Sequence, residues 1–219
     1  MGQYYFPLMI GEDETGEQVL SRAYSHDFDS GLKLMEHSWI GNKFVNAVLG
    51  ELYCDAKRLA WIGDYATDVV DTNTVFSDNF IRGKRAFKKW YDIAMRGVDD
   101  IKTISPDSVS PYDLNMENQY GFIINETKGV FLDFERYIET SKCGNGKEVW
   151  CVNPIPLLTC IGNGQGGGDY SGKSMDLVGS WAFDKLRVTD IRPAIYKEFD
   201  PPVFVERNDF DIYEGVPFS

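Results

Sequence analysis

Histidine, paired cysteines and long apolar runs are all scarce in this chain. Its 219 residues include two histidines and four cysteines, and no two of the cysteines have Cys-x-x-Cys spacing. This pattern does not indicate a zinc centre. A local signature of Ser/His/Asp or Cys/His hydrolysis is also lacking. We therefore expect reduced, mostly buried cysteines and no metal or cofactor.

No apolar run approaches the roughly 20 residues that a membrane-spanning helix needs. Residues 1–5 lack the basic start and apolar centre of a signal peptide. The sequence therefore predicts a protein of the cytoplasm that makes no membrane contact. Because 43% of the residues are apolar and 14% are aromatic, the chain is able to bury a sizeable core.

Positive charge is also in short supply, since the formal net charge is −12. General nucleic-acid binding is not expected, because that binding depends on Lys and Arg displacing counterions from phosphates. Basic residues gather within residues 80–97, whereas acidic residues dominate from Glu198 to Glu214. An acidic tail of this kind is usually a solvated surface, and in a minority of proteins it blocks a basic partner by mimicking phosphates.

Two hairpins are predicted from runs of aromatic and branched residues that flank turn signals. The first joins residues 3–10 to residues 18–24, and the second joins residues 119–125 to residues 130–137. Asn42 is expected to cap a helix that follows the first hairpin.

A strand is expected at residues 58–62, and a second helix over residues 78–96. The aromatic stripe of that second helix is typical of a surface that faces a core.

Two segments of the chain share one order of parts. Residues 3–65 and 119–190 each contain a Gln-Tyr hairpin, an apolar run, an Ile-Gly-Asn triplet and a strand that ends in an acidic residue. This order predicts an α+β fold with mixed or antiparallel sheets, built from two hairpin-led pseudo-repeats with a few helices. Chance similarity is the alternative explanation.

The chain is expected to form one compact domain with three regions. These are a first pseudo-repeat over residues 1–75, a helical insert and linker over residues 76–117, and a second pseudo-repeat over residues 118–219 that includes the acidic tail.

Residues 162–172 form a glycine-rich segment directly after an apolar run. Glycine at this density indicates backbone at positive φ or backbone that closely approaches another group. The segment is therefore the main candidate for a ligand site. The ligand-binding candidates are Gly164, Gly166, Gly167, Gly168, Asp169, Lys173, Trp39 and Trp181, the tryptophans being typical interface anchors.

Residues 167–174 also fit the phosphate-loop pattern G-x-x-x-x-G-K-[ST]. The context argues against a nucleotide triphosphatase, because too little chain follows to build a parallel sheet and Asp169 would repel a phosphate. A simpler anion or nucleotide site stays open as an alternative.

His37 and Asp64 are the candidates for acid/base catalysis. The structural alternatives are a hydrogen-bonded core histidine for His37 and a turn-capping carboxylate for Asp64.

Four short segments stand out as a set: MGQYY at 1–5, GLKLMEHSWIGN at 31–42, WIGDYA at 61–66 and GNGQGGGDY at 162–170. Together they resemble a family of uncharacterised proteins encoded by phages and by bacteria that carry mobile elements. The resemblance implies an accessory gene of a phage or prophage, and it implies no activity or catalytic residues. Small acidic proteins in that setting often neutralise a host defence component or its nucleotide signal.

Three functions follow as hypotheses. The first is an anti-defence binding protein, an inhibitor that blocks a host protein or sequesters a small anionic or nucleotide ligand. The second is an enzyme that acts on a phosphate-containing or nucleotide substrate, with His37 or Asp64 as acid/base. The third is a structural or interaction subunit without a ligand.

Overall fold

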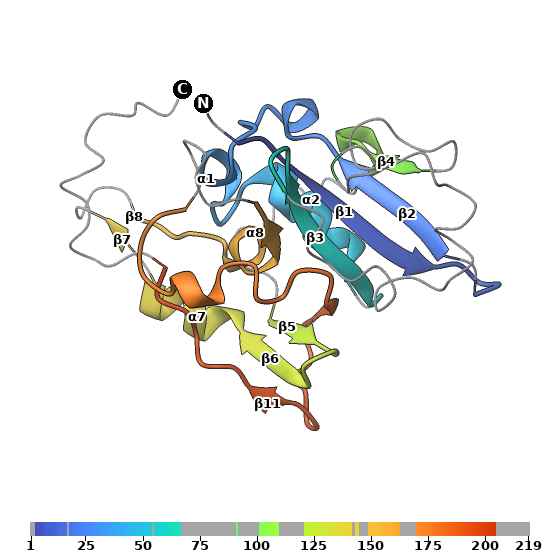
Figure 1. Cartoon of the computed structure of the whole chain (residues 1–219). Helices are drawn as coiled ribbons and strands as arrows, with labels where there is room; N and C mark the ends of the chain where they lie inside the picture. Colours follow the sequence, from blue (N-terminus) through green and yellow to red (C-terminus); the bar gives the residue numbers. More distant parts are fainter. Residues whose placement is uncertain are drawn as a thin grey trace.

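A nine-stranded mixed sheet, a separate two-stranded ribbon and several short helices make up the described part of the chain (Figure 1). The predicted α+β fold is therefore confirmed. No helix among the described residues is long and apolar enough to cross a membrane. The computed structural model describes residues 3–16, 18–53, 55–66, 91, 101–109, 121–141, 143–144, 149–162 and 170–204.

The first half follows the sequence prediction closely. Strand β1 (Tyr5–Glu12) pairs antiparallel with β2 (Gln18–Ala23) on one side and with β3 (Lys57–Gly63) on the other. Helix α2 (Lys43–Glu51) lies between β2 and β3 in the chain. The side-chain oxygen of Asn42 accepts hydrogen bonds from the amides of Phe44 and Val45, at 3.0 and 3.2 Å, so the predicted N-cap is confirmed.

The second hairpin is shorter than predicted. It joins β5 (Phe122–Asn125) to β6 (Val130–Asp133). The expected continuation of the second strand to residue 137 is wrong, because helix α7 (Phe134–Ser141) begins directly after β6. The buried positions 134, 137, 138 and 141 follow a helical period. The Asp133 carboxylate accepts a hydrogen bond from the Arg136 amide at 3.1 Å and so satisfies a free amide of the first turn.

Helix α8 (Pro154–Thr159) occupies the apolar run before the glycine-rich segment, and the Asn153 side chain caps it by accepting from the amide of Ile155. Strand β10 (Lys185–Thr189) then pairs antiparallel with both β5 and β3. The remaining short elements are η1 (Ser25–Phe28), α1 (Leu34–His37), η2 (Pro106–Ser108), β7 (Cys143–Gly144), β8 (Val149–Trp150) and η3 (Met175–Leu177).

The strand order is β11-β6-β5-β10-β3-β1-β2-β4, with β9 (Cys160–Ile161) also on β3. At the two edges, β4 (Lys102–Ile104) runs parallel to β2, and β11 (Lys197–Glu198) runs parallel to β6. Each half of the described sheet therefore has an edge strand, a hairpin and a third strand, and the two third strands, β10 and β3, pair at the centre. Duplication of one ancestral unit stays a prediction, as do the boundaries near residues 75 and 118.

Two apolar layers bury the central strands on both faces. On β1 and β3, Tyr5, Met9, Leu59 and Trp61 belong to the larger cluster, which contains the apolar residues of α2 and α8. The intervening residues Phe6, Leu8, Ile10, Ala60 and Ile62 belong to a second cluster that includes Phe183. Tyr91, the one described residue of the predicted 78–96 helix, packs edge-on against Phe6 in this second layer.

Cys151 and Cys160 are buried, as predicted for reduced thiols. Their Sγ atoms donate to the main-chain oxygens of Val152 and Leu157. Cys54 and the side chain of Cys143 lie outside what the structure describes.

Candidate functional site

His37 lies at the centre of the larger apolar layer and is 0% exposed. Its Nδ1 is 2.9 Å from the carbonyl oxygen of Gly31, and its Nε2 is 2.9 Å from the indole nitrogen of Trp61. Because the indole N–H only donates, Nε2 must accept, and the imidazole is neutral with its proton on Nδ1. Burial lowers the pKa of His37 from 6.5 to about 4, against the opposing effects of Gly31 and Glu36. These contacts give His37 a structural role.

Asp64 follows directly after β3, and both of its described polar contacts go to Tyr4. Its Oδ1 accepts from the Tyr4 amide at 3.1 Å, and its own amide donates to the Tyr4 carbonyl at 3.0 Å. The carboxylate thus extends the pairing between β1 and β3 by one position. His37 and Asp64 lie in different surroundings and share no hydrogen bond among those described.

The two candidate tryptophans occupy the interior rather than an open surface. Trp181 is 1% exposed, and its ring centroid lies 5.1 Å from that of Phe199. Trp39 is half-buried against the larger layer, and its backbone bridges antiparallel to Val152. Trp181 therefore offers no side-chain surface to an external partner.

Only the two ends of the glycine-rich segment are described. A Cβ on Gly162 would overlap the hydroxyl of Tyr5 and the amide of Gln3, so glycine is required there by the protein's own interior. At the other end, the Tyr170 hydroxyl donates to the main-chain oxygen of Lys173, whose side chain is exposed. The candidates Gly164, Gly166, Gly167, Gly168 and Asp169 lie outside the described residues.

The residues after Lys173 do not match a phosphate loop. That motif places its Lys and Ser at the start of an α-helix that follows a strand. Ser174 instead has φ of 53° and precedes the three-residue turn η3.

A surface feature that sequence reasoning missed lies between β10 and β11, and we call residues 190–196 the isoleucine loop. Within it, Ile191 is 79% exposed and Ile195 is 87% exposed. The other large apolar residues on the described surface are at most 48% exposed. Exposed side chains of this size are unusual when they stand close together on one short loop. The loop is therefore the clearest candidate contact surface among the described residues.

Arg192 holds the centre of the isoleucine loop in place. Its guanidinium lies 3.2 Å from the Asp133 carboxylate and 2.6 Å from the Glu198 carboxylate. It also lies 5.7 Å from the ring centroid of Phe122 and 5.3 Å from that of Phe131, within the range of cation–π attraction.

The flanks of the loop are fixed as well. At its start, the Tyr53 hydroxyl donates to Asp190 at 2.5 Å, and the Ile191 amide donates to Thr189 Oγ1 at 3.1 Å. At its end, β11 pairs with β6. The hydrogen bond from Arg136, helped by Arg192, lowers the pKa of Glu198 below its usual value.

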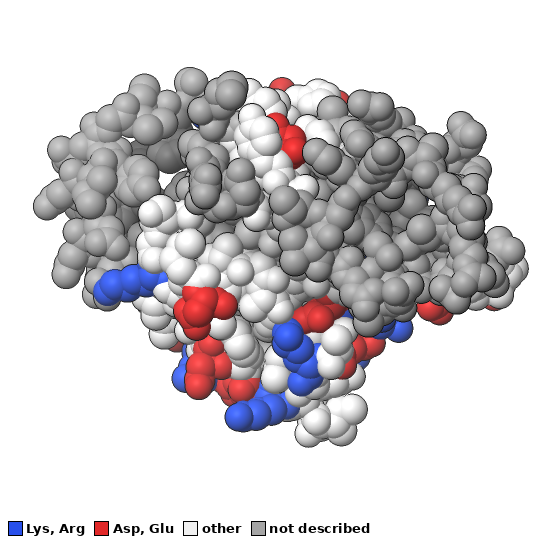
Figure 2. All heavy atoms as spheres, viewed as in Figure 1, with Lys and Arg blue, Asp and Glu red and all other residues white. Residues whose placement is uncertain are grey.

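The charges next to the loop are largely paired with one another. Figure 2 shows basic and acidic side chains interspersed over the region of β6 and β11, around uncharged surface. A partner that covers the isoleucines would therefore leave few buried charges without an opposite charge beside them.

No group of three or more His, Cys, Asp or Glu side chains that could hold a metal ion occurs in the described ranges. A search of protein-family models finds no match to this chain, and comparisons with curated proteins and with solved structures find none either. Function must therefore be inferred from the geometry of these residues.

Proposed function

We propose that the protein acts by binding another protein, and that the isoleucine loop is its contact surface. The observation that carries this proposal is the exposure of Ile191 and Ile195, at 79% and 87%, on a loop whose neighbours fix its backbone. A loop that is already ordered loses little further entropy when a partner binds it. Rigid apolar side chains surrounded by paired charges are the usual anatomy of an interface centre and its rim.

The contacts of His37 and Asp64, the two candidates for acid/base catalysis, favour a binding function over a catalytic one. Both ring nitrogens of His37 are engaged within the core, and the Asp64 carboxylate is bound to the Tyr4 amide. A general base needs to reach a substrate proton through a hydrogen bond, directly or through one water. His37, which is 0% exposed, has no such access while these contacts last.

The resemblance to phage and prophage proteins suggests which kind of protein is bound. An accessory protein of that type would occupy a component of host defence in the bacterial cytoplasm and so act as an inhibitor. The acidic character of the chain, with a net charge of −12, would favour association with a basic target.

The proposal predicts that acidic substitutions in the isoleucine loop weaken binding and leave the fold intact. Full burial of an isoleucine contributes about 1.5–3 kcal/mol, so Ile195→Asp should weaken the affinity at least tenfold. Partners would be captured from host lysate with wild-type protein. The purified partner would then be titrated by calorimetry against wild type, Ile191→Asp and Ile195→Asp.

Met175→Asp is the matched control, because Met175 is 48% exposed and lies outside the loop. It should bind the partner like wild type, and all three variants should keep the wild-type melting temperature. A captured partner that binds Ile195→Asp and wild type equally well would refute the isoleucine loop as the contact surface. Self-association that is lost in Ile195→Asp would instead identify a second copy of the chain as the partner.

A further inference from the structure

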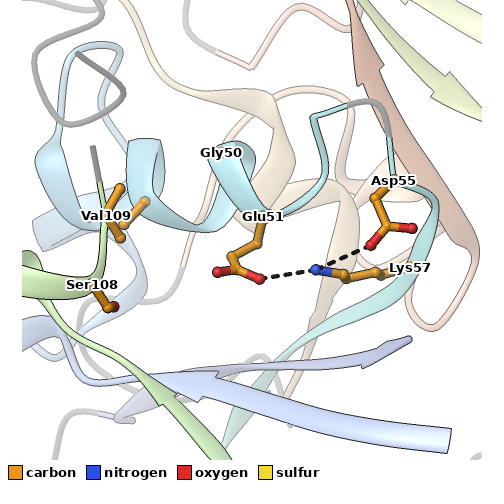
Figure 3. A pocket seen from close by; sticks show the side chains of 7 residues that line it. Gly50, Glu51, Asp55, Lys57, Ser108 and Val109 are labelled. Carbon is orange, nitrogen blue, oxygen red and sulfur yellow. Dashed lines mark hydrogen bonds and ion pairs between the residues drawn. The ribbon is translucent and has the colours of Figure 1, made fainter. Parts of the chain in front are cut away.

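A small pocket of about 250 Å³ lies between α2, the start of β3 and the turn η2 (Figure 3). Its wall on the α2 side is formed by small residues, and its rim carries charged groups, as Figure 3 shows for Glu51, Asp55 and Lys57. Its lining residues are Ala47, Gly50, Glu51, Asp55, Lys57, Ser108 and Val109.

Two ammonium groups share one largely buried carboxylate at this pocket. The side chains of Glu51 and Lys57 are each 15% exposed, and Glu51 Oε2 lies 2.9 Å from Lys57 Nζ. The second oxygen of Glu51 lies 2.8 Å from Nζ of Lys102, which belongs to the edge strand β4. Burial opposes the charged form of Glu51, but the hydrogen bonds from Lys102 and Lys57 outweigh it and lower the pKa of this carboxyl.

Asp55 completes the charge balance with a weaker contact. It lies 3.4 Å from Lys57 Nζ, and its side chain is 65% exposed. An ion pair at this distance in which one partner is largely exposed contributes little. Without Asp55, the positive charges of Lys57 and Lys102 would exceed the single negative charge of Glu51. Asp55 has the most exposed side chain of these four charged groups, so it is the one that an incoming anion would displace from Lys57.

Gly50 leaves part of the α2 side of the pocket without a side chain. It lies within the last turn of α2 and lines the pocket. Glycine is the least favourable residue in a helix after proline, and alanine would serve the helix better. A glycine at this position is explained if a side chain there would narrow the pocket.

We propose that this pocket binds a small molecule through a carboxylate or phosphate group, which displaces Asp55 from the Lys57 ammonium. The remainder of the molecule would lie against Ala47, Gly50 and Val109. The volume is below the roughly 300–1,000 Å³ of pockets that hold drug-sized ligands, so the ligand is a small metabolite rather than a dinucleotide. This inference does not depend on the isoleucine loop or on a protein partner.

The test is an amide NMR titration of the isolated protein with inorganic phosphate and, separately, with propionate, each against chloride at matched ionic strength. We expect saturable shifts at Ala47, Gly50 and Glu51 with at least one of the two anions. The tighter of the two identifies the oxyanion that the pocket prefers. Shifts that spread over the whole surface without saturating, or no shifts with either anion, would overturn the proposal.

Substitutions give results of opposite sign. Lys57→Met should weaken binding at least tenfold, because it removes a hydrogen bond between charged groups. Asp55→Asn should strengthen binding, because it removes the competing carboxylate from an exposed position where the fold is unaffected. Lys197→Met is the matched control, because it also removes an ammonium group, but from β11 at the far edge of the sheet. It should bind the anion like wild type.

Gly50→Ala should raise the melting temperature and weaken binding. Weaker binding by Asp55→Asn would show that Asp55 does not compete with the anion and would refute the proposal. Unchanged affinity in both Lys57→Met and Gly50→Ala would place the anion elsewhere on the molecule.

Discussion

Acid should destabilise the protein through His37, and the contacts of this side chain determine the size of the effect. In the folded state the imidazole is buried among Phe44, Trp61 and the loop at Gly31, and Glu36 on its own helix acts on it electrostatically. Protonation would place a charge in this apolar layer and would remove the acceptor for the Trp61 indole. In the unfolded chain the same imidazole gains a proton freely as the pH falls through about 6.5.

The direction and the magnitude follow from proton linkage. Since burial lowers the pKa of His37 from 6.5 to about 4, the unfolded state binds the proton first. The stability that the neutral imidazole contributes is complete above pH 6.5 and is lost as the pH falls towards 4. The free energy of unfolding should decrease by about 2 kcal/mol at pH 5 and about 3 kcal/mol at pH 4 from this group alone.

Urea unfolding of wild type and His37→Gln between pH 7.5 and pH 5 measures this contribution. His37→Gln will be less stable at neutral pH, but the difference from wild type should shrink by about 2 kcal/mol as the pH falls to 5. His26→Gln is the matched control, because the His26 side chain is 64% exposed. It removes an exposed histidine and leaves the buried contacts of His37 in place. Parallel profiles for wild type and His37→Gln would refute the reasoning.

Three further predictions concern local structure. Asn42→Ala should lower the free energy of unfolding by about 1 kcal/mol in urea titrations, because it removes the cap of α2. Gly162→Ala should cost about 1–3 kcal/mol by overlapping the Tyr5 hydroxyl, whereas Gly11→Ala, which meets only the flexible Lys57 side chain, should cost much less. Arg192→Met should raise the amide hydrogen-exchange rates of residues 191–196 and leave those of the central strands unchanged.

Much of the sheet was predictable because its signals are local. Turn residues between two apolar runs predict a hairpin. Asn42 directly precedes apolar residues at helical spacing, which predicts a capped helix. The short apolar run at residues 154–158 was harder, because periodicity alone does not separate a buried helix from a strand. Its start signal was present, since Asn153 caps α8 just as Asn42 caps α2, with Pro154 in the first turn. The order of strands depends on contacts between distant segments and was not predictable.

The candidate sites were less predictable than the fold. Residue type alone could not show that Trp181 and His37 face the interior, because a buried and an exposed side chain at these positions produce the same local sequence pattern. The pocket beside α2 depends on Glu51, Lys57 and Lys102, which are brought together by three separate elements. The isoleucine loop had one local signal, two isoleucines in a proline-containing stretch after a strand, but such residues are more often buried.

The centre of the sheet has a consequence for synthesis of the protein on the ribosome. Among the described strands, β9 and β10 alone cover one edge of β3, and both emerge from the ribosome long after β3 itself. Until then the nascent chain carries an apolar strand with unpaired amides and carbonyls, which invites pairing with other chains. We expect newly made molecules to depend on chaperones during this interval, and fragments that end before β10 to aggregate.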